Sequence, residues 1–152
     1  MHTRRALFRR SARVAALLAM ASLLPAGALA FDRRRAFDAE TMAALMKVLG
    51  AGRPTESKDV TLTADDLVEN GAAVPIAVAS ALPGVKRMLV LVEKNPGILA
   101  ASFDVTDAVE ASFSTRVKMH MSSSVYGVAM MSDGRVLFAQ KDVKVTIGGC
   151  GG

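Results

Sequence analysis

The chain has 152 residues, 51% hydrophobic and 22% charged, a composition that excludes an intrinsically disordered protein. Its formal charge is +5, but five of the 19 basic residues lie in residues 1–30, which contain no acid, so the remainder has 14 basic against 14 acidic residues. This balance removes the electrostatic reason to expect a nucleic-acid-binding protein. We expect one globular domain behind an N-terminal targeting segment.

Residues 1–30 have the layout of an export signal. An arginine-rich start precedes an apolar run from Val14 to Leu24, and the segment ends in "AGALA", a small-residue cleavage pattern with Ala28 and Ala30. The apolar run is shorter than the roughly 20 residues of a membrane-spanning helix, which makes a retained anchor the less favoured alternative. We expect cleavage near Ala30 and no membrane association of the mature chain.

The start of this segment also carries a twin-arginine pattern. The sequence "TRRALFR", with Arg4 and Arg5, has the expected pair followed by large apolar residues and a base. Twin-arginine signals export proteins that have already folded, whereas a general secretory signal is the alternative. The mature protein is therefore predicted to be periplasmic.

A short helix is predicted next, within residues 31–54, which also include a linker. The run "DAETMAALMKVLGAG" follows a charged stretch with three arginines and offers Gly50 as a left-handed closing residue. The residues expected on its apolar face are Ala43, Ala44, Leu45, Met46, Val48 and Leu49.

From residue 55 the hydrophobic pattern changes to the two-residue period of strands. A tight hairpin is predicted at Ser132-Asp133-Gly134, where glycine permits a positive φ. Turns are also expected at Glu69-Asn70-Gly71 and Lys94-Asn95-Pro96-Gly97. The predicted strands are centred on residues 60–63, 74–78, 85–93, 99–105, 113–119, 125–131, 135–140 and 142–147.

The spacing of these strands predicts the fold class. Short strands at intervals of about ten residues, without helices between them, are typical of an all-β, immunoglobulin-like antiparallel sandwich. A parallel α/β fold would need crossover helices, which the sequence lacks. We expect the sandwich to span residues 55–147, with a flexible arm over residues 148–152.

The arm "GGCGG" contains the only cysteine of the chain, Cys150, between Gly148-Gly149 and Gly151-Gly152. Glycine has no side chain to hold it in place, so the arm should move freely unless a partner binds it. It should carry the thiol on the order of 10 Å beyond the last strand.

The chemistry expected of this thiol is that of a carrier and not of a catalyst. Nothing near Cys150 in the sequence stabilises the thiolate or acts as a base, so partner enzymes would have to activate the sulfur. A metal site needs about four clustered ligands, and His120 stands alone, so we interpret it as a surface histidine and expect no metal or cofactor.

Other interpretations of the arm stay open. The tail could be a disordered end with an incidental cysteine, or could form an intermolecular disulfide. A ubiquitin-like sulfur carrier also ends in Gly-Gly but needs ATP, which the periplasm lacks. A prenylation signal is excluded because it requires three residues after the cysteine.

The ending "VKVTIGGCGG", preceded in order by "ENGAAVPI", "VEKNPG", "ASFDVT", "STRVK" and "MSDGR", resembles the SoxY family. The resemblance covers about Glu69 to Gly152 and includes the twin-arginine signal. It implies a sulfur-carrier subunit of a SoxYZ complex, which holds intermediates of thiosulfate oxidation covalently on Cys150.

The resemblance also implies partners. A SoxZ-like second sandwich subunit would form a heterodimer with this chain. A SoxAX cytochrome would attach thiosulfate to the cysteine, the SoxB hydrolase would release sulfate, and the SoxCD sulfur dehydrogenase, where present, would oxidise the remaining sulfur. The competing hypothesis is an exported immunoglobulin-like binding or assembly module whose tail cysteine only forms an intermolecular disulfide.

Overall fold

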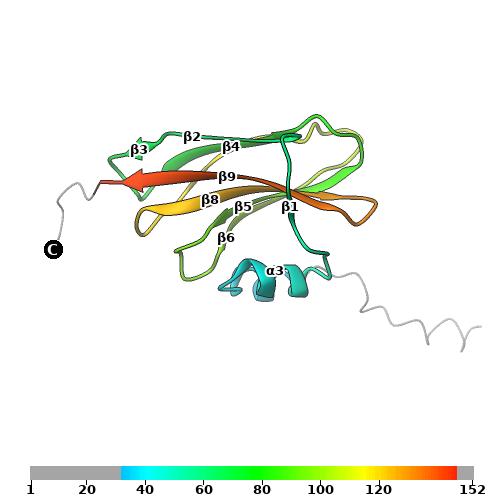
Figure 1. Ribbon diagram of the computed structural model, residues 1–152, viewed down its shortest axis with the longest axis horizontal. Coiled ribbons are helices and arrows are strands. Elements are labelled where there is room, and N and C mark those ends of the chain that lie inside the picture. The colour runs from blue at the N-terminus through cyan, green and yellow to red at the C-terminus, as the bar shows by residue number, and fades with distance from the viewer. Residues whose placement is uncertain (1–31, 147–152) are drawn as a thin grey trace, which may run out of the picture. The chain divides into compact units, whose positions relative to one another are not determined.

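The computed structural model describes residues 32–146, which form two β-sheets packed face to face (Figure 1). The predicted signal, with Arg4, Arg5, Ala28 and Ala30, and the predicted glycine arm lie outside the described residues. The larger sheet has the strand order β1-β9-β8-β5-β6, with β3 also paired to β9, and the smaller has the order β2-β4-β7. The predicted immunoglobulin-like sandwich is therefore confirmed.

Most neighbouring strands are antiparallel, and the two shortest strands pair in parallel with β9. The strands are β1 (Thr55–Glu56), β2 (Val60–Ala64), β3 (Leu67–Val68), β4 (Val74–Ser80), β5 (Val85–Val92), β6 (Leu99–Asp104), β7 (Ser112–Val117), β8 (Ser123–Met131) and β9 (Val136–Val145).

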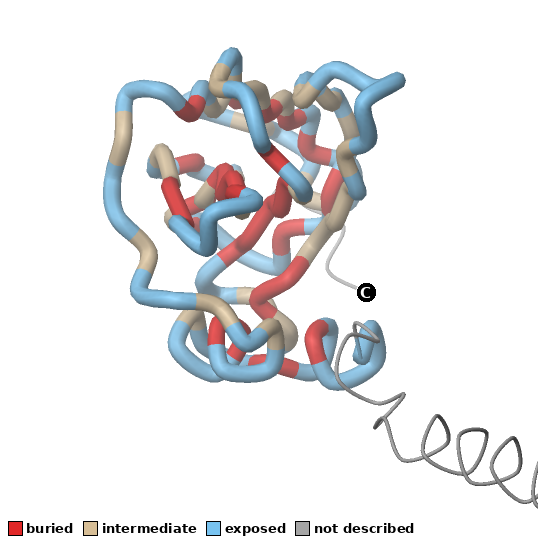
Figure 2. The backbone as a smooth tube through the Cα atoms, turned by 90° about the vertical axis from the view of Figure 1, so that its right-hand side faces the viewer, coloured by how far each residue is buried: buried red, intermediate tan, exposed pale blue. Residues whose placement is uncertain are grey.

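The core lies between the sheets because alternate residues of each strand face inward. On β5, Met88, Val90 and Val92 are fully buried against the smaller sheet, from which Val74 and Val78 point back at them. Figure 2 shows the buried residues gathered between the two layers and the exposed ones outside. Phe103 and Phe113 stack with ring centroids 4.6 Å apart, one from each sheet.

Within the described residues, two short helices precede the sandwich, α2 (Arg33–Phe37) and α3 (Met42–Val48). The prediction of a single helix in residues 38–52 was partly wrong, because the stretch of three arginines itself forms α2. The Thr41 side chain accepts a hydrogen bond from Ala44 N at 3.1 Å, and this N-cap makes α3 begin at Met42. Gly50 closes α3 with φ +61°, as predicted.

The helices cover the outer face of the larger sheet, and Figure 1 shows α3 on the side away from β2 and β4. Ile98 N donates to Ala39 O at 2.8 Å, which ties the helical segment to the sheet. Leu89 and Leu91 of β5, fully buried, point to this face because they alternate with the core residues. Within the part of the chain that the structure describes, neither helix is long and apolar enough to cross a membrane.

The predicted apolar face of the helix was too wide. Leu45 and Met46 are buried, whereas Ala43, Ala44 and Val48 are exposed. A seven-residue helix that lies on a flat sheet buries only a narrow stripe, so two large side chains fill its contact.

Two strand boundaries also differ from prediction. The two expected strands at residues 135–140 and 142–147 form one strand, β9, because β8 pairs with it without a break from Met130↔Val136 to Ser123↔Val143. Strand β7 stops at Val117, two residues before Met119, where the chain turns away from the sheet. The hairpin between β8 and β9 is confirmed, with Gly134 at φ +90°.

Candidate functional site: the root of the C-terminal arm

The last strand continues past its antiparallel partner. The final β8–β9 pair is Ser123↔Val143, so residues 144–146 extend beyond the ladder. On one edge they are bound by β3 and by the residue before it. Lys144 N donates to Asp66 O and Thr146 N donates to Val68 O, both at 2.9 Å. We call residues 144–146, with the groups that hydrogen-bond their backbone, the arm root. The predicted arm, residues 148–152, begins two positions after Thr146.

The other edge of the arm root is held by a side chain. The hydroxyl of Ser122 accepts a hydrogen bond from Val145 N at 2.9 Å and lies 3.4 Å from Val145 O, to which it donates. A single hydroxyl can serve both groups because it is a donor and an acceptor. Three successive backbone N–H groups, at Lys144, Val145 and Thr146, are therefore all paired.

Two loops pack beside the arm root. Met119 N donates to Gly71 O at 2.7 Å, and a Cβ on Gly71 would lie 2.5 Å from Met119 O and 3.0 Å from a methyl group of Val145. Only glycine lets these backbones approach so closely. The prediction of a turn at Gly71 is correct, and its packing role was not predicted.

A third loop is attached by Asn95. Its side-chain Nδ2 donates to Lys118 O at 2.7 Å, and its Oδ1 accepts from His120 N at 3.2 Å. The turn between β5 and β6 is thereby linked to the segment that leads to Ser122. These contacts organise the loops at the end of the sandwich from which the chain leaves.

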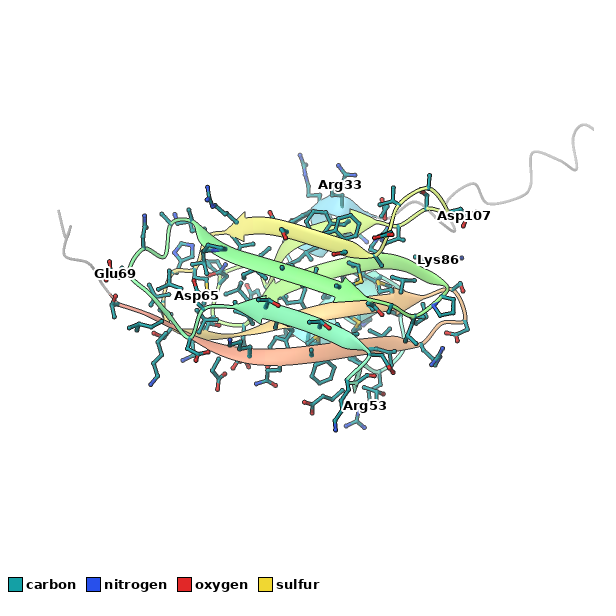
Figure 3. All side chains as sticks on the ribbon, turned by 90° about the horizontal axis from the view of Figure 1, so that it is seen from above. Arg33, Arg53, Asp65, Glu69, Lys86 and Asp107 are labelled. Atoms are coloured by element: carbon teal, nitrogen blue, oxygen red, sulfur yellow. The ribbon has the colours of Figure 1, made fainter. Side chains whose placement is uncertain are left out.

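The surface beside the root is partly apolar. Leu67 on β3 is 58% exposed and Met121 on the opposite side of β9 is 54% exposed. Lys141 holds the turn before β3, with its Nζ 2.9 Å from Asp66 Oδ1 and 2.5 Å from Ala64 O. Charged Asp65 and Glu69 lie at the same end (Figure 3).

A cavity of about 860 Å³ lies at the other end of the sandwich. Its lining includes Leu82, Val109, Lys86, Glu110 and Ser132, next to the hairpin where β9 begins. Since β9 has ten residues at about 3.3 Å each, roughly 30 Å separates this cavity from the arm root. Figure 3 shows Lys86 and Asp107 at this end and Glu69 at the other.

His120 is exposed, as predicted for a surface histidine. Among residues 32–146, no three His, Cys, Asp or Glu side chains gather in a way that could hold a metal ion.

Among the residues that the structure describes, two ionisable groups have shifted pKa values, and both lie outside the arm root. Burial, followed by the charge of Glu93, raises the pKa of the Tyr126 hydroxyl above its usual 10.0. The backbone N–H of Arg135, and then its guanidinium, lower the pKa of Asp133 in the hairpin by hydrogen bonds at 3.0 and 2.7 Å. Tyr126 lies within β8 and Asp133 in the hairpin before β9, so these shifts do not identify a catalytic pair at the arm root.

The sequence patterns did not predict most of the contacts that hold the arm root. Cys150 and the arm glycines, Gly148, Gly149, Gly151 and Gly152, lie outside the described residues. Asn95 was predicted only as a turn residue. Ser122 is the first of three consecutive serines and carries no pattern of its own, and β3 has only two residues, too few for a periodicity.

Known proteins similar to this chain share its fold. Residues 45–150 match the family model described as "Sulfur oxidation protein SoxY". The structure of the sulfur carrier protein SoxY from Chlorobium limicola f. thiosulfatophilum aligns with 30% sequence identity and a TM-score of 0.61, over 69% of this chain and 94% of that one. No curated protein sequence matches the chain.

A second structural match concerns the fold alone. Superoxide reductase (neelaredoxin) from Ignicoccus hospitalis aligns with a TM-score of 0.51 and 14% identity, over 57% of this chain and 80% of that one. The family model, by contrast, spans more than two thirds of the chain and ends at the arm cysteine, Cys150. The chain therefore belongs to the SoxY family of sulfur oxidation proteins.

Proposed function

We propose that this protein is a periplasmic sulfur carrier, without catalytic activity of its own, that holds thiosulfate-derived intermediates on Cys150. The observation that carries the proposal is the family match over residues 45–150, which reaches the single cysteine of the chain. The similar protein from Chlorobium limicola is itself described as a sulfur carrier.

The arrangement of the arm root supports this proposal. Hydrogen bonds hold the backbone as far as Thr146, so Cys150 is four residues from a fixed point. The residues between them include Gly148 and Gly149, which have no side chains. A slim segment of this kind suits entry into narrow pockets of several different enzymes.

The proposed chemistry begins with oxidative attachment. The Cys150 thiol and thiosulfate join through a new sulfur–sulfur bond, and the thiol proton and two electrons are lost to the medium and to a SoxAX-like cytochrome, respectively. A SoxB-like hydrolase then adds water to the terminal sulfonate. Sulfate and two protons leave, and a persulfide anion remains on Cys150. A SoxCD-like dehydrogenase, where present, would oxidise that sulfur for another hydrolysis.

A SoxZ-like subunit completes the proposed carrier as a heterodimer. Export by the twin-arginine route, through Arg4 and Arg5, would allow the folded chain to cross the membrane with this partner. Covalent attachment would keep reactive sulfur species from diffusing away between enzymes.

The test is intact mass spectrometry of the mature protein from thiosulfate-grown cells, before and after reductant. We expect added sulfane and sulfonate masses that map to Cys150 and disappear with reductant, and loss of thiosulfate oxidation in Cys150→Ser. A bare thiol, or only a Cys150–Cys150 disulfide, in cells that are oxidising thiosulfate would instead support the binding or assembly module.

A further inference from the structure

We propose that Ser122 is a positioning residue for the arm, and that with β3 it fixes Thr146 as the point from which the arm starts. This role rests on the carrier function proposed above, since it matters only if Cys150 must be delivered to other proteins. Its physical basis lies in the hydrogen bonds on the two edges of the last residues of β9.

Successive N–H groups of an extended strand point to opposite edges. Accordingly, Lys144 N and Thr146 N point to the edge on which β3 lies. Asp66 O, directly before β3, and Val68 O accept hydrogen bonds from them at 2.9 Å. Val145 N points to the edge that β8 occupies earlier along the strand.

On that edge the ladder has already ended. The last β8–β9 pair is Ser123↔Val143, and the backbone preceding Ser123 leaves β9 toward the loop that contains Met119. Without Ser122, Val145 would lose its partner at both N–H and C=O. The Ser122 hydroxyl replaces the missing strand, at 2.9 Å from Val145 N and 3.4 Å from Val145 O.

β3 alone is a weak support for the arm root. It contributes two residues, and Leu67 is 58% exposed, so little apolar burial holds it against β9. Of the two Ser122 bonds, the one to Val145 O is long and weak at 3.4 Å, so loss of the hydroxyl removes about one full hydrogen bond. Such a loss shifts a local opening equilibrium by roughly fivefold. Removal of the Ser122 hydroxyl should therefore let the strand end open back toward Val143.

Opening of the root would change where the thiol can go. Four residues separate Thr146 from Cys150, a reach of roughly 13 to 14 Å at full extension. From Val143 there are seven residues, and the reach grows to about 25 Å. Since effective concentration falls as about the −3/2 power of tether length, the thiol would become about twofold more dilute at any one partner pocket.

The experiment uses the mature full-length chain with a spin label on Cys150, its only cysteine. Paramagnetic broadening of backbone amide signals then maps where the arm travels. The variants are Ser122→Ala and Ser122→Thr, which keeps the hydroxyl. The matched control is Ser124→Ala, because the Ser124 hydroxyl bonds Asp142 Oδ1 at 2.6 Å and has no hydrogen bond to the arm root.

In Ser122→Ala, we expect hydrogen exchange of the Val145 and Thr146 amides to accelerate roughly fivefold, while exchange of the Val128 amide in the core stays unchanged. The set of amide signals broadened by the spin label should extend farther along the sheets. Ser122→Thr and Ser124→Ala should behave as the original chain. In a reconstituted system, Ser122→Ala should raise the KM for the carrier by at most about twofold and leave kcat unchanged.

Unchanged exchange at Val145 and an unchanged broadened region in folded Ser122→Ala would overturn the proposal. If that variant does not fold, Thr146→Pro removes the N–H donor on the β3 edge and should also enlarge the broadened region. If the broadened region stayed unchanged in Thr146→Pro, Thr146 would not be the fixed point from which the arm starts. Both spectroscopic measurements require no partner enzyme, so failure of the carrier function would appear separately, as a bare Cys150 in the mass spectra.

Discussion

Gly127 of β8 and Val78 of β4 meet across the sandwich so closely that a Cβ on Gly127 would lie 2.9 Å from Val78 Cγ1. Val78 is only 1% exposed, so its methyl group cannot move aside into solvent. We predict that Gly127→Ala lowers the free energy of unfolding by about 1 to 3 kcal/mol through overpacking. Denaturant-induced unfolding measures this change.

Gly52→Ala is the matched control for this substitution, since the nearest atom to its Cβ would be 3.8 Å away. It should leave stability unchanged or raise it slightly. Val78→Ala removes the clashing methyl groups, so the cost of Gly127→Ala should shrink in that background. If the unfolding free energies lost in Gly127→Ala and Val78→Ala simply added in the double variant, the two residues would not clash.

Asn95 links two loops at the end of the sandwich, and its substitution should cost more than that of an asparagine with only local bonds. Asn95→Ala removes the hydrogen bonds to Lys118 O and from His120 N, and we expect a loss of about 1 to 2 kcal/mol in unfolding free energy. Asn70→Ala removes only the bond from Ala72 N, within one turn. Equal losses for the two variants would contradict a linking role for Asn95.

The single tyrosine permits a direct measurement of its ionisation. Burial, then the Glu93 charge, raises the pKa of Tyr126 above 10.0, so the phenolate absorbance of the native protein should appear at higher pH than in denaturant. Glu93→Gln should move the native titration part of the way back. Coincident titrations in the native and denatured states would refute this account.

The raised pKa of Tyr126 also fixes the sign of its effect on stability. Below the unfolded pKa the hydroxyl is protonated in both states and contributes no pH dependence. As the pH rises through that value, the unfolded chain loses the proton first. The Tyr126 contribution therefore lowers the free energy of unfolding at alkaline pH, by an amount that Tyr126→Phe should remove.

The exposed side chains of Leu67 and Met121 flank the arm root, so an enzyme that takes Cys150 within the reach of the arm must approach them. If the proposed carrier function holds, we predict that Leu67→Ser and Met121→Ser together weaken association with a SoxAX-like enzyme at least roughly tenfold, since burial of such a side chain is worth about 1.5 to 3 kcal/mol. Binding assays with the purified partner measure this loss.

Val109→Ser serves as the control for that surface. Val109 is 44% exposed but lies beside the cavity at the opposite end of the sandwich. Its substitution should leave association with the same enzyme unchanged. Equal effects at the two ends would argue against a docking surface around the arm root.

Alternation of apolar residues was enough to predict the larger strands. Val74, Ile76 and Val78 share a face because one side of β4 packs on the core and the other faces outward. The alternation of β5 is hidden, since its central residues are buried on both faces, yet its dense run of branched side chains still marked it as a strand.

Features that depend on neighbours could not be predicted in this way. Residues 136–145 contain Gln140, Lys141 and Asp142, which interrupt the apolar pattern and suggested two strands. Unbroken pairing with β8 joins these residues into the single strand β9. Lys141 can lie within this strand because the Asp66 carboxylate and Ala64 O bind its ammonium group. Three arginines likewise gave no sign of α2, whose only buried residue is Ala36.

The sequence by itself determined the sandwich, the hairpin at Gly134 and the position of a lone cysteine four residues after Thr146, because local periodicity, glycine conformation and residue order are properties of the chain alone. Only the tertiary structure decided how residues 144–146, the arm root, are held. The hydrogen bonds of Ser122 to Val145, of Val68 to Thr146 and of Asn95 to its neighbouring loop join residues that are 23 to 78 positions apart or in separate loops. Such contacts form only when packing of the core brings distant segments together.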